Sequence, residues 1–154
     1  MRLENLLAPE GVISPLKAST KKQVLQEFAE RAAELSGASA REIFDALLHR
    51  ERLGSTGIGD GVAIPHGRLA GVDSIVGVFA RLDRPIDFDS LDGAPVDLVF
   101  MILTPETSGA DHLKALACAA RLLRDPSCAA TLRSTRDAAA IYSLMTREAK
   151  PHAA

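Results

Sequence analysis

The sequence predicts an α/β domain, a three-layer sandwich in which a mixed, mostly parallel sheet of about four to five strands is flanked by helices. The first observation is helical periodicity in the segments before and after the strand-forming runs. The second is a nearly continuous apolar run over residues 95–103, which is typical of a strand covered on both faces. The third is a length of 154 residues, 47% of them apolar, which supports one core of ordinary size. Because each buried strand needs cover on two faces, helices are expected on both sides of the sheet.

Two helices are predicted in the first third of the chain. Thr20 begins a capping box ahead of the first helix, and Gly37 ends that helix where a left-handed C-cap is favoured. Ser39 begins the second helix, which ends near Leu53. Both segments repeat apolar residues at helical spacing, so each is expected to bury one side against the sheet.

Residues 54–61 (GSTGIGDG) are predicted to form a loop, because four glycines in eight residues suit neither a helix nor a central strand. A short strand over residues 62–64 is cut off by Pro65, and His66 stands at its end. The remaining predicted elements are strands over 74–82 and 95–103 and helices over 111–124, around 132 and over 137–147. We expect a single domain over residues 1–150 and a flexible tail over residues 151–154.

Charge and composition exclude several classes of function. Lys and Arg number 18 against 20 Asp and Glu, a net charge of -2, so the basic excess that holds nucleic acid is missing. The apolar runs fall short of the roughly 20 residues of a membrane span, and residues 1–10 lack a signal-peptide pattern. Cys118 and Cys128 form neither a CxxC pair nor a disulfide framework. We therefore expect a cytoplasmic protein without membrane insertion and without a nucleic-acid partner.

The stretch over residues 50–68 carries the candidate chemistry. Its glycines allow backbone N–H groups to converge on an anion, and its arginines can neutralise a phosphoryl group. It is neither a Walker A loop nor a dinucleotide-binding fingerprint. His66 is of interest because a neutral imidazole, with a pKa of about 6.5, can attack phosphorus without a separate base. Considered alone, His66 is more often a strand-end histidine whose ring is bonded to a carbonyl.

The run LGSTGIGDGVAIPHG, residues 53–67, resembles the phosphorylation-site signature of the phosphotransferase-system (PTS) enzyme IIA domains of the fructose and mannitol class, type 2. The resemblance is greatest to the nitrogen-regulatory branch of that family. It extends over nearly the whole chain, through the motifs KKQVLQEFAE, REIFDALLHRER, FARLDRPIDFDSLDGAPVDLVFMIL and DHLKALA.

The resemblance implies roles for three residues. His66 matches the histidine that accepts a phosphoryl group on its tele nitrogen, Nε2, from a phosphohistidine of an HPr- or NPr-type carrier protein. Arg50 matches the family's active-site arginine, which stabilises the phosphoryl charge, and His112 a second histidine that orients the first ring or bonds the phosphoryl group. The residues alone also allow Arg50 to pair with Asp45 or Glu51, and His112 to serve as a helix-cap histidine.

Further candidates lie around these three residues. The predicted phosphoryl-binding loop comprises Ser55, Thr56, Gly57, Gly59 and Gly61. Ser55 and Thr56 either bond the phosphoryl oxygens or make a local turn. Arg52 and Arg68 are weaker candidates for holding the loop or attracting phosphate. Asp60 would repel a phosphoryl group if its carboxylate pointed inward, and could meet a basic carrier surface if it pointed outward.

The resemblance implies a phosphocarrier without cofactor or metal, an enzyme in the limited sense that it carries a phosphoryl group. The chain shows no fused IIB or membrane segment, which favours regulation through phosphorylation-dependent binding of target proteins such as kinases or potassium-transport components. One alternative is a sugar-specific IIA component that passes phosphate to a IIB domain. Others are a non-catalytic anion-binding module and a metallohydrolase using His66 and His112, for which the sequence offers no third ligand.

Overall fold

The computed structural model describes residues 1–148 of the protein. The predicted tail over residues 151–154 lies outside the described residues. The elements follow along the chain in the order η1 (Leu3–Asn5), β1 (Leu7–Leu16), α1 (Lys21–Ser36), α2 (Ala40–Arg52), β2 (Gly57–Gly59), β3 (Val62–Ala63), β4 (His66–Leu69), β5 (Val76–Ile86), β6 (Val96–Pro105), α3 (Ala110–Arg124), α4 (Pro126–Ser134) and α5 (Ala138–Glu148).

The caps of the first two helices form as the sequence predicts. The Thr20 hydroxyl accepts a 3.1 Å hydrogen bond from the backbone of Gln23, which satisfies a free N–H group at the start of α1. Gly37 ends α1 with a φ of 78°, in the left-handed region that favours glycine. Ser39 caps α2 in the same way as Thr20 caps α1. Local sequence therefore determines where both helices begin and where α1 ends.

The sheet is mixed, as predicted, and its strands follow the order β1-β5-β6-β3-β2, with β4 also paired to β6. Strand β6 lies parallel to β3 and β4 and antiparallel to β5, and β1 lies parallel to β5. The described sheet has six strands rather than four to five. Strands β1, β2 and β4 are not among the segments predicted as strands. Of these, β1 lies at one edge of the sheet and contains Pro9 and Pro15, which disfavour a strand prediction. An edge strand tolerates proline because one side of its backbone makes no ladder bonds.

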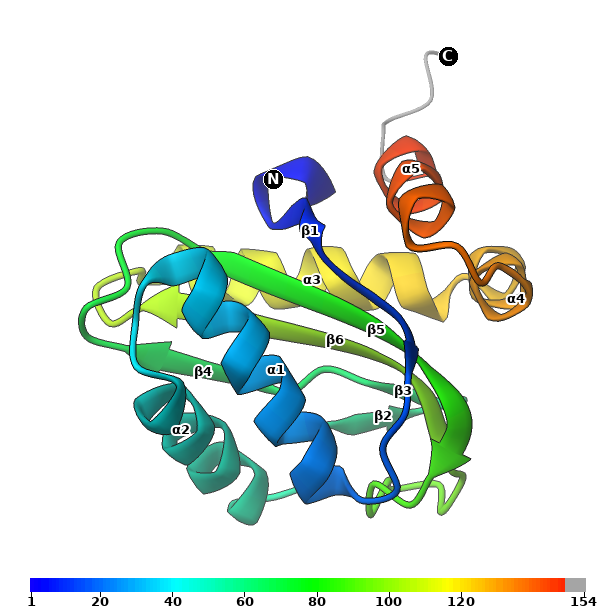
Figure 1. The fold of residues 1–154 in the computed structure, drawn as a ribbon, viewed down its shortest axis with the longest axis horizontal. Helices are drawn as coiled ribbons and strands as arrows, with labels where there is room; N and C mark the ends of the chain where they lie inside the picture. Colours follow the sequence, from blue (N-terminus) through cyan, green and yellow to red (C-terminus); the bar gives the residue numbers. More distant parts are fainter. Residues whose placement is uncertain (149–154) are drawn as a thin grey trace.

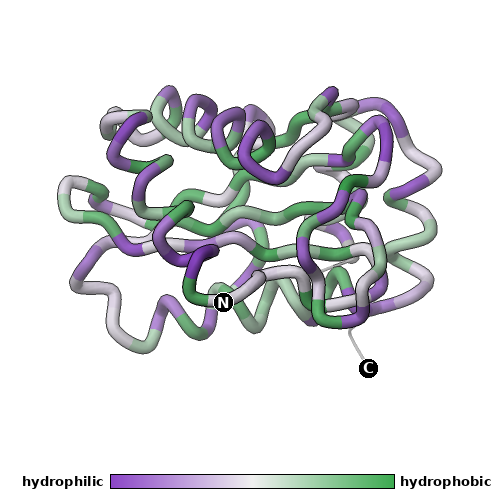
Figure 2. The backbone as a smooth tube through the Cα atoms, turned by 90° about the horizontal axis from the view of Figure 1, so that it is seen from below, coloured by the Kyte–Doolittle hydropathy of each residue, from purple (hydrophilic) through white to green (hydrophobic). Residues whose placement is uncertain are grey.

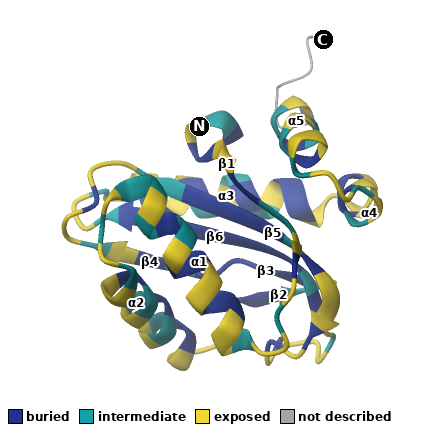
Figure 3. Ribbon diagram, viewed as in Figure 1, coloured by how far each residue is buried: buried dark blue, intermediate teal, exposed yellow. Residues whose placement is uncertain are grey.

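Helices cover both faces of the sheet, which confirms the three-layer class (Figure 1). On one face α1 and α2 pack on alternate residues of β5 and β6, among them Val78 and Met101. On the other face α3, α4 and α5 pack on the intervening residues, among them Phe79 and Phe100. Strand β6 and the first half of β5 are the most deeply buried strand segments, and they are rich in apolar residues (Figures 2 and 3). Within the described residues, no helix has the length and apolar character needed to cross a membrane.

The start of β4, the end of α2 and the start of α3 meet beside one edge of the sheet and define the place of the site. Strand β4 begins at His66 and pairs with β6 from Ile102 onward. Helix α2 packs beside β4, so its last turn lies near His66. Helix α3 follows β6 after a short turn and brings its first residues back toward the same point.

Candidate functional site

The His66 ring is held at both of its nitrogens. Nδ1 lies 2.8 Å from the carbonyl oxygen of Ile64, which can only accept a hydrogen bond, so Nδ1 carries the proton. Nε2 accepts a 3.2 Å hydrogen bond from Nε of Arg50, which can only donate. The two contacts together assign a neutral ring whose lone pair is on Nε2. That is the nitrogen which the resemblance implies as phosphoryl acceptor.

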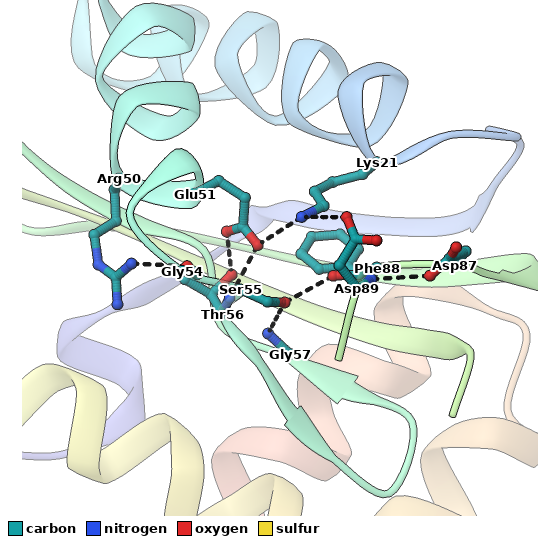
Figure 4. Close-up of polar contacts among 10 residues, drawn as sticks. All are labelled: Lys21, Arg50, Glu51, Gly54, Ser55, Thr56, Gly57, Asp87, Phe88 and Asp89. Atoms are coloured by element: carbon teal, nitrogen blue, oxygen red, sulfur yellow. Dashed lines mark hydrogen bonds and ion pairs between the residues drawn. The ribbon is translucent and has the colours of Figure 1, made fainter. Parts of the chain in front are cut away.

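Arg50 stands in the last turn of α2 and is half-buried. Its Nη1 donates a 2.9 Å hydrogen bond to the carbonyl of Gly54, just past the end of the helix (Figure 4). Glu51, one of the two carboxylates that the sequence also allowed as an ion-pair partner, binds Thr56 and Lys21 instead. The Arg50 guanidinium therefore links the His66 ring to the backbone of Gly54, which follows α2.

His112 lies in the first turn of α3 and is buried, with 7% of its surface exposed. Its Nδ1 lies 2.6 Å from the hydroxyl of Thr104 on β6. The rings of His112 and His66 meet edge to face, with centroids 5.4 Å apart. The structure thus brings Arg50, His66 and His112, which lie far apart in the sequence, into one cluster.

Both histidines have lowered pKa values. For His66 burial is the largest cause of the lowered pKa, the Ile64 hydrogen bond opposes it, and the positive charge of Arg50 adds to it. Burial also dominates at His112, where the positive charge of Arg68 and the charge that His66 would carry on protonation contribute, and the pKa falls to about 4. Both rings are therefore neutral at pH 7, as a nitrogen nucleophile requires.

Two pockets adjoin at the His66–Arg50 contact. The larger has a volume of about 350 Å³ and a basic lining. Its basic residues are His49, Arg50, His66, Arg68 and His112. The smaller, of about 210 Å³, is lined on its apolar side by Ile58, Ile64, Leu116 and Ala120. An anion is favoured on the first side and an apolar side chain on the second.

The hydroxyls of Ser55 and Thr56 are engaged within the protein (Figure 4). Ser55 Oγ donates to the carbonyl of Phe88 at 2.7 Å and accepts from the backbone of Gly57 at 3.0 Å. Thr56 Oγ1 donates to Glu51 at 2.5 Å. In this structure both side chains therefore hold the local turn, which is one of the two roles that the sequence allowed.

The predicted glycine loop is in part a β-hairpin, and the prediction is wrong for residues 57–59. Strand β2 pairs with β3 through a two-residue turn, Asp60 and Gly61, whose φ angles are 57° and 79°. Positive φ at both positions defines the turn type for which Asp-Gly is a preferred sequence. The Asp-Gly dipeptide between Ile58 and Val62 was the signal that could have identified the hairpin.

The hairpin turn is tied to elements away from His66. The Asp60 backbone N–H donates to Asp92 at 3.0 Å, and the Asp60 carbonyl accepts from Arg133 at 2.7 Å. Asp60 is exposed and lines neither pocket at His66. Gly59 and Gly61 belong to the same hairpin and likewise line neither pocket.

Of the two weaker arginine candidates, one lies in the site and the other does not. Arg68 lines the larger pocket and contributes to the lowered pKa of His112, so it joins the site. Arg52 is exposed at the end of α2 and lines neither pocket.

Sequence reasoning missed the contacts of Glu51 and Thr104, because threonine in an apolar run predicts only a strand and glutamate at a helix end predicts only solvent exposure. Within residues 1–148, no three His, Cys, Asp or Glu side chains cluster in a way that could hold a metal ion.

A mixed α/β sandwich with two histidines and an arginine at the edge of its sheet defines the class, and the chain belongs to the PTS EIIA type-2 family. The family model described as "Phosphoenolpyruvate-dependent sugar phosphotransferase system, EIIA 2" matches residues 5–148. The resemblance identified from the sequence is thereby confirmed.

Within that family the chain is similar to nitrogen regulatory proteins. It is 59% identical over 145 residues to the one from Bradyrhizobium diazoefficiens, covering 94% of this chain and 95% of the relative. Identity to the Pseudomonas aeruginosa protein is 43% over 146 residues, with 94% and 95% covered. The crystal structure of IIA-Ntr from Neisseria meningitidis superposes with a TM-score of 0.88 at 35% identity, covering 94% and 99% of the two chains. The Escherichia coli IIA mannitol structure, 23% identical with a TM-score of 0.76 over 90% and 97% of the chains, shares the fold.

Proposed function

We propose that this protein is a phosphocarrier of the nitrogen-regulatory type, in which Nε2 of His66 accepts a phosphoryl group from a phosphohistidine of an HPr- or NPr-type carrier. Residues 1–150 act as the single phosphocarrier domain, in the cytoplasm, where the carrier acts. The observation that carries the proposal is the assigned state of the His66 ring. Its proton is held on Nδ1 by Ile64, and its lone pair on Nε2 faces Arg50 at the junction of the two pockets.

The transfer needs no additional base. The Nε2 lone pair forms the new N–P bond while the N–P bond on the carrier breaks, and that electron pair returns to the carrier's ring. The proton stays on His66 Nδ1 throughout, and Nδ1 keeps donating its hydrogen bond to the Ile64 carbonyl. Catalysis therefore consists of positioning and of stabilising the charge on the transferred group.

Three side chains perform that stabilisation. The guanidinium of Arg50 moves from Nε2 to the phosphoryl oxygens, to which it offers a planar array of donors. His112, neutral at pH 7 and bonded through Nδ1 to Thr104, has its ring edge to face with that of His66 and keeps its other ring nitrogen for the phosphoryl group. Arg68 adds positive charge at the pocket wall and attracts the phosphorylated carrier.

The output we propose is regulatory. Phosphorylation adds about -1.5 to -2 of charge to a pocket lined by Arg50 and Arg68, so the positive charge that this surface offers to a target protein is largely cancelled. Target proteins, such as kinases or potassium-transport components, would then distinguish the two states by charge. The relatives named nitrogen regulatory proteins support this output over transfer to a sugar-specific IIB domain.

The test is intact-mass analysis at alkaline pH, after incubation with phosphoenolpyruvate, the first enzyme of the system and its HPr-type carrier. We expect wild type to gain one phosphoryl group that mild acid removes, and His66→Ala to gain none. The matched control is His152→Ala, a histidine outside the described residues, which should gain the group as wild type does. A wild type that stays unmodified while the carrier is phosphorylated would reject the proposal. Loss of the group to an added fructose- or mannitol-type IIB domain would favour the sugar-transport alternative.

A further inference from the structure

Thr56 lies in the segment that positions both hydrogen-bond partners of the His66 ring, the Ile64 carbonyl and the Arg50 guanidinium. On one side, the Thr56 carbonyl accepts a 2.9 Å hydrogen bond from the backbone N–H of Ile64, whose own carbonyl holds His66 Nδ1. On the other side, Gly54 lies two residues before Thr56 and holds the guanidinium of Arg50, which bonds His66 Nε2. A displacement of Thr56 would therefore move both partners of the ring.

Glu51 fixes Thr56 in place. Its carboxylate accepts hydrogen bonds from the Thr56 backbone at 2.9 Å and from the Thr56 hydroxyl at 2.5 Å (Figure 4). The Glu51 side chain is 3% exposed, so an incoming carrier protein does not contact it. Two contacts to one residue hold both the position and the rotation of that residue, which a single contact does not.

The buried charge of Glu51 is compensated by Lys21. Nζ of Lys21, at the start of α1, lies 3.1 Å from Glu51 Oε1 and 3.1 Å from Asp89 Oδ2. It also sits over the ring of Phe88, 5.2 Å from the centroid. A buried carboxylate without a partner would be costly, so the ion pair with Lys21 compensates Glu51 where Thr56 needs an acceptor.

Helix geometry explains why neighbouring residues serve different groups. Arg50 and Glu51 are consecutive in the last turn of α2, where successive side chains point about 100° apart. Arg50 therefore reaches His66 while Glu51 reaches inward to Thr56. The same helix turn supplies both the group that contacts the acceptor nitrogen and the group that fixes its support.

We propose that Glu51 and Thr56 form a positioning pair for phosphoryl transfer, holding the His66 ring in its Nδ1–H form and the Arg50 guanidinium at Nε2. The inference rests on the proposed function. The hydrogen bonds of the Glu51 and Thr56 side chains go to groups other than His66, so the pair positions the ring through the backbone of residues 54–64 and through Arg50. The negative charge of Glu51 also acts on His66 directly, where it opposes the lowering of the pKa. A role in stability alone would leave the ring tautomer and the rate of transfer unchanged in a folded variant.

The experiment compares Glu51→Gln and Thr56→Val with wild type, with Glu42→Gln as the matched control, since Glu42 is exposed on the same helix. The first readout is the tautomer of neutral His66, observed by the ¹⁵N shifts of its ring. We expect the Nδ1–H form to dominate in wild type and in Glu42→Gln, and an admixture of the Nε2–H form in the other two variants.

The second readout is the steady-state kinetics of phosphoryl transfer from the carrier. We expect kcat to fall about tenfold or more in Glu51→Gln and Thr56→Val, because a misplaced nucleophile slows the transfer step. The KM for the carrier should stay unchanged, because both residues are buried and do not touch the carrier. Thr56→Ser keeps the hydroxyl and should restore most of the rate. Since Thr56→Val also keeps the backbone bond to Glu51, the Val and Ser pair decides the question if Glu51→Gln does not fold.

Folded variants with the wild-type tautomer and a kcat within twofold of wild type would overturn the inference while leaving the phosphocarrier proposal intact. A wild type that is never phosphorylated would instead reject the phosphocarrier proposal, and the transfer role of Glu51 and Thr56 with it.

Discussion

Nε of Arg50 lies 3.2 Å from Nε2 of His66 and covers the lone pair that the phosphoryl group must use. The same guanidinium is tied through Nη1 to the carbonyl of Gly54 at 2.9 Å. Arg50 therefore occupies the acceptor nitrogen of the unphosphorylated protein. Its guanidinium must move to the phosphoryl oxygens as the N–P bond forms. The tie to Gly54 keeps that movement short, because one end of the guanidinium stays in place.

Arg50→Lys tests this double role. A lysine ammonium is a single point charge and cannot bond Gly54 and His66 in one fixed plane. We expect the rate of phosphoryl transfer to fall about 10- to 100-fold, corresponding to about 1.4 to 2.7 kcal/mol of transition-state stabilisation, while His66 still becomes phosphorylated on long incubation. Rapid-quench kinetics with the phosphorylated carrier gives the rate, and circular dichroism checks the fold. A rate equal to that of wild type would show that positive charge alone suffices.

Gly57 is packed against Ser90 so closely that a side chain at residue 57 has no room. A Cβ built there would lie 2.2 Å from Ser90 Oγ and 3.1 Å from the Ser90 Cα atom. Rotating the Ser90 hydroxyl away would leave the contact with the main chain, so the loop over residues 87–93 must shift. We expect Gly57→Ala to lower the free energy of unfolding by about 1–3 kcal/mol, as overpacking does, measured by urea denaturation.

A double-mutant cycle separates this clash from other effects of Gly57→Ala. Ser90→Gly removes the Oγ and Cβ contacts and leaves only the main-chain one. We expect the double variant Gly57→Ala with Ser90→Gly to recover part of the lost stability. Strictly additive losses would mean that the two residues do not interact, and would contradict the close packing of Gly57 on Ser90.

Local sequence signals were enough for most of the fold but not for its edges. The caps at Thr20 and Ser39 and the apolar run of β6 depend on neighbouring residues, and all three were predicted. Strand β1 was missed because its prolines are compatible with a strand only at the sheet edge, a fact of topology. Strand β5 also continues past Pro85 to Ile86, with an irregular register that allows it.

The site could be predicted only where a family signature marks it. Arg50, His66 and His112 were identified by resemblance, since periodicity alone leaves each of them compatible with a structural role. Glu51 and Thr104 were missed because their roles depend on contacts made by folding, including one between Glu51 and Lys21 that spans 30 residues of sequence. Buried polar side chains that support a site leave no local pattern.

Arg133 joins α4 to the hairpin of β2 and β3 and to the start of β6. Its Nε lies 3.0 Å from both carboxylate oxygens of Asp97, and its Nη2 donates to the Asp60 carbonyl at 2.7 Å. The Arg133 and Asp97 side chains are 35% and 23% exposed, so the pair is only partly screened by water. We expect Arg133→Gln to cost about 1 kcal/mol of stability, measured by urea denaturation at low salt. A variant as stable as wild type at low salt would contradict a stabilising role for the Arg133–Asp97 pair. At 1 M salt we expect a smaller loss of stability.

The lowered pKa of His112 makes the fold sensitive to acid. Burial is the main cause, and it brings the pKa to about 4 from the ordinary 6.5. Between these two values the unfolded chain binds a proton at His112 that the folded chain does not, so the free energy of unfolding decreases as the pH falls from 6.5 toward 4. Above pH 6.5 both states are neutral at this residue and its contribution is constant. The decrease attributable to His112 is about 2–3 kcal/mol across this window.

His112→Gln removes this titration while its amide can still bond the Thr104 hydroxyl. We expect the free energy of unfolding of the variant to depend less steeply on pH between 6.5 and 4, and the curves to converge toward the acid end. His66, whose pKa is lowered mainly by burial, adds a decrease of the same sign, so some slope remains in the variant. Urea denaturation at half-unit pH steps gives both curves. Parallel curves for wild type and His112→Gln would show that folding does not change the pKa of His112, and would contradict the burial described for its ring.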